Sequence, residues 1–122
     1  MILLDTNGLL WLDQNHRRAR QLSRGTAPLA VSPATLLELH FLLETGRIRL
    51  RSGTVRALLD DARWEIDEPP ALEWFSRAAE ESWTRDPFDR LIVAHARLRR
   101  WPLATGDFAV LGRLRPSERF EL

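Results

Sequence analysis

Short apolar runs separated by amphipathic stretches organise this chain of 122 residues. The first run, Ile-Leu-Leu at residues 2–4, is uninterrupted and ends in a carboxylate at Asp5. Runs this short, without alternation of polar residues, are typical of strands that are buried on both faces, as in a parallel sheet. Further strands are predicted at residues 29–31, 64–66 and 101–105, with a short fifth strand at residues 119–122.

Helical periodicity and capping residues fill the segments between these runs. Ser32-Pro33 and Asp86-Pro87 each place a good N-cap before a proline at the first helical position. Helices are expected at residues 8–15, 17–22, 33–46, 53–62, 71–82, 86–98 and 108–111. The helix over residues 71–82 is predicted to bury Leu72, Phe75 and Ala79. Strands that alternate with helices through short connections predict an α/β fold, with a parallel sheet covered on both sides by helices.

Length and composition limit the class of protein. A single domain is expected, because 122 residues suit one hydrophobic core. No apolar stretch approaches the roughly 20 residues of a membrane span, and the N-terminus lacks the pattern of a signal peptide, so a soluble, cytoplasmic protein is expected. The absence of cysteine excludes disulfides, thiolate nucleophiles and Cys-ligated zinc. Any metal would therefore have oxygen ligands, which favours Mg²⁺ or Mn²⁺.

The cationic residues, all of them arginine, are unevenly distributed although the net charge is only +1. Residues 16–63 carry nine Arg and four acids, residues 64–84 one Arg and six acids, and residues 85–122 eight Arg and five acids. The planar guanidinium group suits phosphate contacts, so two basic stretches around an acidic one fit a polyanionic substrate. A solvated surface explains the same distribution, and both interpretations stay open.

Carboxylates recur where the predicted strands end. Asp5 follows the first strand, and Asp107, in Thr105-Gly106-Asp107, follows the fourth. Because the carboxyl ends of parallel strands meet at one edge of a sheet, the two aspartates are expected side by side. Their charges would repel each other without a divalent cation between them. The alternative is that Asp5 merely caps the helix that follows it.

Three further acids lie on predicted helices. Glu38 has leucine on both sides and no clear polar stripe around it, and a carboxylate near an apolar surface needs a compensating cation. The alternative places Glu38 on a solvated face. Asp86 is a good N-cap, and Asp89 suits the positive end of the same helix. Capping alone explains these two acids, yet helix N-termini lie at the edge of the sheet where Asp5 is expected.

The order and spacing of these motifs resemble those of PIN-domain ribonucleases, and most of all the VapC toxins of bacterial toxin–antitoxin pairs. The matching segments are Leu-Leu-Asp-Thr-Asn at residues 3–7, Ser-Pro-Ala-Thr-Leu-Leu-Glu-Leu at 32–39, Arg-Asp-Pro-Phe-Asp-Arg-Leu-Ile-Val-Ala-His-Ala at 85–96 and Ala-Thr-Gly-Asp at 104–107. Each motif alone is weak, but their order and positions along nearly the whole chain are together fairly specific.

The resemblance implies a three-layer α/β/α PIN domain over residues 1–122, with a four- to five-stranded parallel sheet and an acidic cluster that binds Mg²⁺ or Mn²⁺ and cleaves RNA. It assigns metal binding and catalysis to Asp5, Glu38, Asp89 and Asp107, a further catalytic role to Asp86, and supporting roles to Thr6, Asn7 and Thr105. It also implies a homodimer and a small antitoxin protein as partner. The chain departs from the family pattern after Glu38, where relatives often carry a lysine and this sequence has Leu42, Leu43 and Glu44.

Two other interpretations stay open. The chain could be a PIN-fold nuclease of RNA maturation, or a non-catalytic module that binds RNA or protein and uses its acids only as caps. Phosphotransfer enzymes of the haloacid-dehalogenase type and response-regulator receivers also place an aspartate after the first strand, but both need a lysine, which this chain lacks. His40, His95 and most of the five tryptophans are expected to be structural.

Overall fold

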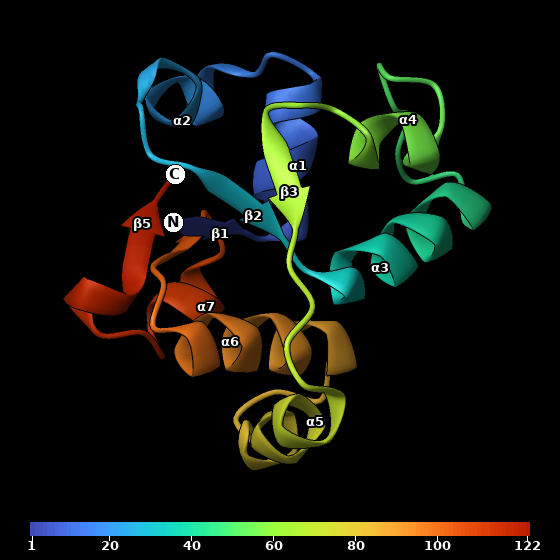
Figure 1. Cartoon of the computed structure of the whole chain (residues 1–122). Helices are drawn as coiled ribbons and strands as arrows, with labels where there is room; N and C mark the ends of the chain where they lie inside the picture. Colours follow the sequence, from blue (N-terminus) through green and yellow to red (C-terminus); the bar gives the residue numbers. More distant parts are fainter.

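The computed structural model describes all 122 residues and contains one five-stranded sheet in which every pair of neighbours is parallel. The strands are β1 (Ile2–Leu4), β2 (Leu29–Val31), β3 (Trp64–Ile66), β4 (Leu103–Thr105) and β5 (Arg119–Glu121). Their order across the sheet is β3-β2-β1-β4-β5, which makes β1 the central strand. The strands and helices alternate along the chain, and the predicted three-layer α/β/α fold is confirmed (Figure 1).

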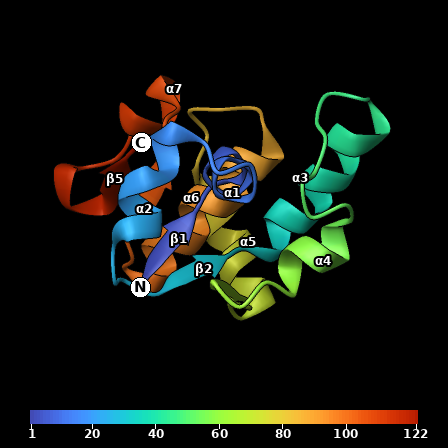
Figure 2. The ribbon, with the colours of Figure 1, turned by 90° about the horizontal axis from the view of Figure 1, so that it is seen from above.

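Helices cover both faces of this sheet (Figures 1 and 2). They are α1 (Thr6–Asp13), α2 (Arg20–Arg24), α3 (Pro33–Glu44), α4 (Val55–Leu59), α5 (Ala71–Glu80), α6 (Pro87–Arg99) and α7 (Phe108–Leu111), with short 3-10 helices at Arg17–Ala19 and Pro116–Glu118. None of these helices is long and apolar enough to cross a lipid bilayer.

The two faces of the sheet belong to two separate hydrophobic clusters. Ile2 and Leu4 of β1 pack with α1 and α4, whereas Leu3 packs on the other face against α6. Successive side chains of a strand point to opposite faces, so a central strand with both faces covered needs apolar residues throughout. This burial explains why the first apolar run of the sequence is uninterrupted.

The register of the sheet decides which residues leave it together. Leu4 is level with Val31 of β2 and with Ala104 of β4. The Asp5 backbone N–H donates to the carbonyl of Ala104 at 3.1 Å, which continues the pairing by one residue. The chains of β1 and β4 therefore leave the same edge at the same height, as predicted from their sequences.

Helix α5 buries a different face from the one predicted. The exposed fraction of Leu72 is 84% and that of Phe75 is 56%, and Ala79 is also exposed. The buried residues are instead Trp74 and Ala78, one turn apart, and the Trp74 indole N–H donates to the carbonyl of Leu91 at 2.7 Å. The prediction was wrong because α5 packs on α6 and not on the sheet, so a narrow stripe suffices to anchor it.

Two other predicted elements are shorter in the structure. The helix expected over residues 53–62 is reduced to α4, because Gly53 adopts a left-handed conformation with φ of 91° and Thr54 caps the helix by accepting from the Ala57 N–H at 3.1 Å. The strand expected from residue 101 begins at Leu103, since Pro102 has no N–H to donate to a neighbouring strand.

Candidate active site

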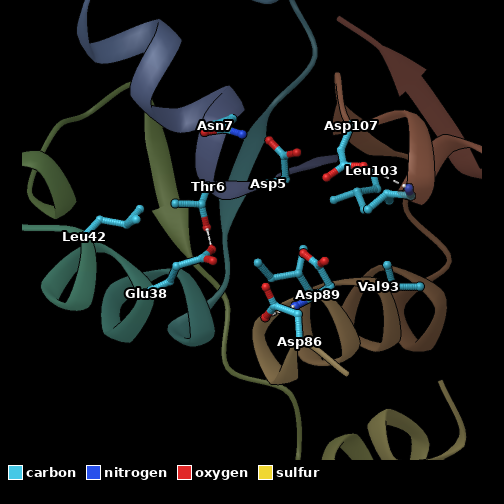
Figure 3. A pocket seen from close by; sticks show the side chains of 12 residues that line it. Asp5, Thr6, Asn7, Glu38, Leu42, Asp86, Asp89, Val93, Leu103 and Asp107 are labelled. Carbon is cyan, nitrogen blue, oxygen red and sulfur yellow. Dashed lines mark hydrogen bonds between the residues drawn. The ribbon is translucent and has the colours of Figure 1, made fainter. Parts of the chain in front are cut away.

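A pocket of about 210 Å³ opens at the carboxyl edge of the sheet. It lies between the start of α1, the middle of α3 and the first turns of α6 and α7 (Figure 3). Its lining includes all five acids that the sequence singled out, Asp5, Glu38, Asp86, Asp89 and Asp107, together with Thr6 and Asn7. No arginine or histidine lines it. The fold thus gathers carboxylates from four segments of the chain around one unneutralised cavity.

The two aspartates at strand ends are both helix caps and pocket residues. Asp5 Oδ1 accepts from the Gly8 N–H at 2.6 Å at the start of α1. Asp107 Oδ1 accepts from the N–H groups of Ala109 and Val110 at 2.8 and 3.3 Å at the start of α7. The sequence treated capping and a functional site as alternatives for Asp5, but the geometry makes them compatible, because each strand passes directly into a helix at this edge.

The two acids of α6 differ in their contacts. Asp86 caps the helix, with Oδ1 accepting from the Phe88 N–H at 2.8 Å and from the Asp89 N–H at 3.3 Å. Asp89 lies in the first turn, and its carboxylate accepts no hydrogen bond from the protein although it is half-buried and faces the pocket (Figure 3). Capping therefore explains Asp86 but does not explain Asp89.

Glu38 faces the pocket and is only partly exposed. The buried hydroxyl of Thr6 donates to Glu38 Oε1 (Figure 3). The same hydroxyl lies 3.4 Å from the hydroxyl of Thr35. These contacts tie the middle of α3 to the first residue of α1. Glu38 is therefore not on a solvated face, which was the alternative left open by the sequence.

The other residues expected to support the acids occupy different positions. Thr105 is fully buried, and its hydroxyl accepts from the Asp107 N–H at 3.1 Å. Asn7 is exposed at the rim of the pocket and makes no side-chain hydrogen bond to the protein. Gly106 is closely packed, since a Cβ there would lie 2.6 Å from Arg18 Nη2 and 2.9 Å from the Trp11 ring. Thr105 and Gly106 thus hold the backbone that presents Asp107.

Comparison with known proteins identifies the fold family. The sequence profile of the PIN domain matches residues 2–113. The chain belongs to the PIN domain family. The resemblance indicated by the motifs is thereby confirmed. No protein with a curated description matches the chain in sequence.

Solved structures with the same fold include three bacterial proteins. A toxin–antitoxin complex from Klebsiella pneumoniae has a TM-score of 0.69 and 23% identity, over 96% of this chain and 94% of that one. VapC20 of Mycobacterium tuberculosis, described as a sarcin–ricin loop cleaving toxin, has a TM-score of 0.58 and 20% identity, over 95% and 100% of the two chains. FitAcB from Neisseria gonorrhoeae has a TM-score of 0.54 and 22% identity, over 92% and 91%.

Burial and mutual repulsion raise the pKa of three acids of the pocket in this PIN domain, Asp5, Glu38 and Asp89. Burial raises the pKa of Asp5 to about 6, with the charges of Asp107 and Glu38 adding to the effect and hydrogen bonds opposing it. Burial also raises the pKa of Asp89 to about 7, together with the charges of all four neighbouring acids. The pKa of Glu38 is raised by burial and lowered in part by its bond to Thr6. The pocket therefore lacks the positive charge that its ionised acids require.

The donor atoms of the pocket fit a hard divalent cation. They are carboxylate, hydroxyl and amide oxygens, the ligands that Mg²⁺ and Mn²⁺ prefer. Glu38, Asp86 and Asp107 each use one carboxylate oxygen in a hydrogen bond and leave the second without a protein donor. No three of the side chains converge on a single coordination point as they stand. Coordination of a cation would therefore require side-chain rotations. The carboxylate oxygens that accept no hydrogen bond from the protein are available to bind it.

The contribution of Asp5 and Asp89 to the stability of the metal-free PIN domain is expected to fall as pH rises from about 4 to about 7. Asp5 and Asp89 have pKa values of about 6 and 7 in the folded chain, against 3.8 for an unperturbed aspartate. In this pH range the folded chain retains the protons of these two acids, whereas the unfolded chain releases them. Rising pH therefore stabilises the unfolded state relative to the folded state. Urea denaturation in EDTA at several pH values measures the effect.

The matched variants for this measurement are Asp89→Asn and Asp60→Asn. Asp89→Asn removes one of the two groups with strongly raised pKa values and should reduce the pH dependence. Asp60 is exposed and lies outside the pocket, so its replacement should leave the dependence unchanged. An equal pH dependence in wild type and Asp89→Asn would contradict the repulsion described here.

The sequence did not single out the apolar residues that form the rest of the pocket wall. They are Leu42, Ile92, Val93, Leu103 and Val110. Their positions carry a detectable signal, because Ile92 and Val93 follow Asp89 by three and four residues, which places them beside it on one helix face. These side chains limit access of water to the acids and so contribute to the raised pKa values.

His95 is structural, as expected from the sequence. It is fully buried on α6, and its Nε2 lies 2.7 Å from Asp67 Oδ2. Arg99 donates to the same carboxylate at 2.8 Å. Burial lowers the pKa of His95, against the opposing effect of Asp67. This cluster lies outside the acidic pocket and ties the segment after β3 to α6.

Proposed function

We propose that this PIN domain is a metal-dependent endoribonuclease that acts as the toxin of a type II toxin–antitoxin system. The observation that carries the proposal is the gathering of five carboxylates in one pocket without a basic residue. An RNA backbone is repelled by such a pocket unless cations neutralise it. The similarity of the fold to VapC20, described as a sarcin–ricin loop cleaving toxin, and to a toxin–antitoxin complex supports the proposal.

Different residues of the chain have different roles in the proposed site. Asp5, Glu38, Asp89 and Asp107 would hold Mg²⁺ or Mn²⁺. Such an ion supplies positive charge next to the scissile phosphate and activates a water molecule for its hydrolysis. Thr6 fixes the orientation of Glu38, and the N-termini of α1 and α7 fix those of Asp5 and Asp107. The amide of Asn7 at the rim is free to contact the RNA.

A non-catalytic role explains fewer of the observations. If the acids served only as caps, Asp5, Asp86 and Asp107 would be accounted for. Glu38 and Asp89 cap no helix, yet both face the same pocket with raised pKa values. Two carboxylates that cap no helix and lie among like charges destabilise the metal-free fold. Cation binding gives this arrangement a function.

Cleavage of RNA by the purified protein is expected to depend on added metal. A labelled RNA pool should be cut in the presence of Mn²⁺ or Mg²⁺ and left intact in EDTA, because the pocket has no cation of its own to neutralise the phosphate. Restoring Mn²⁺ after EDTA should restore cleavage. Cleavage that proceeds equally in EDTA, or no cleavage with either metal across diverse RNAs, would contradict the proposal.

The proposed partners are a small antitoxin protein and a second copy of the chain. Helix α3 supports the proposal of an antitoxin partner, since it exposes Leu37 and Phe41 to the extent of 52% and 50% close to the pocket residue Leu42.

Overexpression in bacteria distinguishes a toxin from a nuclease of RNA maturation. The toxin is expected to arrest growth, and the arrest should be absent for Asp5→Asn. Normal growth at high levels of the active wild type would favour RNA maturation.

A further inference from the structure

A second pocket, of about 690 Å³, lies at the other end of α6 from the acids. It is formed by the last residues of α6, by α5 and by the segment between α7 and β5, all of which are visible in Figure 1. Helix α6 has 13 residues and is therefore roughly 20 Å long. The two pockets are thus separate, and their net charge is opposite, since the second one is lined by a single acid, Glu118, and by four arginines: Arg77, Arg97, Arg100 and Arg115.

The acids near this pocket already have partners. Arg97 donates to Glu81 at 2.6 Å and to Glu118 at 3.0 Å. Arg115 donates to Glu118 at 2.6 Å. Neither Arg77 nor Arg100 has a carboxylate within ion-pair distance, as the ion pairs of the chain show. Two exposed guanidinium groups therefore line the pocket without a negative partner inside the protein.

The backbone conformation of Arg100 is a second unusual feature of this pocket. Arg100 ends α6 in the left-handed conformation, with φ of 58° and ψ of 38°. Glycine or asparagine is the favoured residue at such a position, because a longer side chain crowds the backbone. The Arg100 side chain makes no hydrogen bond, ion pair or aromatic contact within the chain that would compensate. No contact within the chain therefore accounts for arginine at this position.

We propose that this pocket binds the phosphate group of a nucleotide, with Arg77 and Arg100 as its ligands. Arginine suits this role because its planar fork donates two parallel hydrogen bonds to phosphate oxygens. Trp101 is partly exposed in the same lining and offers an aromatic surface to the base. The phosphate belongs either to a free mononucleotide or to an RNA strand. The site is independent of the nuclease proposal, since it shares no residue with the acidic pocket.

The indole N–H signal of Trp101 in two-dimensional NMR spectra reports on this pocket. The chain has five tryptophans, so five indole signals are expected, and Trp101→Phe identifies the relevant one. The probes are adenosine 5′-monophosphate, adenosine and a ten-nucleotide RNA, each titrated into the full chain in EDTA, where RNA stays intact. The monophosphate should shift the Trp101 signal saturably and adenosine should not. Equal effects of the two probes, or no saturable shift with any phosphate-bearing probe, would overturn the proposal.

Two variants test the named ligands. Asparagine tolerates the left-handed conformation of residue 100, and glutamine has a helix propensity close to that of arginine. Arg100→Asn and Arg77→Gln are therefore both expected to fold. Each should weaken binding of the monophosphate about ten-fold, as expected for loss of a charged hydrogen bond. Arg24→Asn, an equal change of charge on α2 away from the pocket, should leave binding unchanged. Equal affinity of all three variants and the wild type would overturn the assignment.

The third probe distinguishes the two sources of the phosphate. If the RNA binds at least ten-fold more tightly than the monophosphate, the pocket holds part of an RNA strand. If the monophosphate binds as tightly as the RNA, the ligand is a free nucleotide. Both outcomes support the phosphate site. They also separate its failure from failure of the nuclease, because binding is measured in EDTA, where no metal-dependent cleavage occurs.

Discussion

Replacing Asp5 by asparagine is expected to reduce metal-dependent RNA cleavage by about 100-fold or more while leaving the fold intact. Asp5 lies at the end of the central strand and faces the charges of Asp107 and Glu38. The substitution removes a carboxylate that the proposed cation requires. It keeps the Oδ1 atom that accepts from the Gly8 N–H, so the cap of α1 survives. Cleavage rates in Mn²⁺ and circular dichroism spectra measure both effects.

The control for this substitution is Asp60→Asn, which makes the same chemical change at an exposed position outside the pocket. It should cleave RNA at the wild-type rate. Because the pKa of Asp5 is raised in the folded chain, Asp5→Asn should also make the metal-free protein more stable at neutral pH. A folded Asp5→Asn protein with wild-type cleavage would refute the role of Asp5.

Replacing Trp74 by alanine is expected to lower the free energy of unfolding by about 3–5 kcal/mol, the usual range for a large aromatic side chain removed from a core. Trp74 is buried between α5 and α6, where its indole N–H donates to Leu91 and its ring lies edge-on to His95. The substitution leaves a cavity and removes the indole hydrogen bond at the contact that anchors α5. Urea denaturation measures the loss.

Phe75 supplies the matched control, because it is the next residue along α5 and also aromatic. Its side chain is 56% exposed, so Phe75→Ala should change stability by less than about 1 kcal/mol. The sequence pattern predicted that Phe75 is buried. A larger loss for Phe75→Ala than for Trp74→Ala would show that α5 packs in the way the sequence suggested.

The position of the acids was predictable because it follows from strand order and local signals. An apolar run followed by a carboxylate marks the end of a buried strand, and parallel strands end at one edge of the sheet. Asp5 and Asp107 meet for this reason, on the neighbouring strands β1 and β4. Asp86 and Asp89 follow from the preference of helix N-termini for acids at the same edge. These rules require no knowledge of long-range packing.

The remaining features depend on packing that the sequence does not encode locally. The buried face of α5 is set by α6, and a pattern of three apolar residues on the wrong side outweighed the single pair that is buried, Trp74 and Ala78. The direction of Glu38 could be suspected but not decided, since it depends on a bond to Thr6, which lies 32 residues earlier. The basic pocket combines Arg77 with Arg100 and Arg115 from segments that only the fold brings together.

The central claim is that acids distant in sequence form one cation-binding site at the edge of the sheet. Crystals of the full chain grown with Mn²⁺ test it most directly, through the anomalous scattering of the metal. An anomalous peak is expected in the pocket, from a metal ion bonded to carboxylate oxygens of Asp5 and of Asp89 or Asp107. Saturating Mn²⁺ with no peak in this pocket, or with peaks only at other sites, would contradict it.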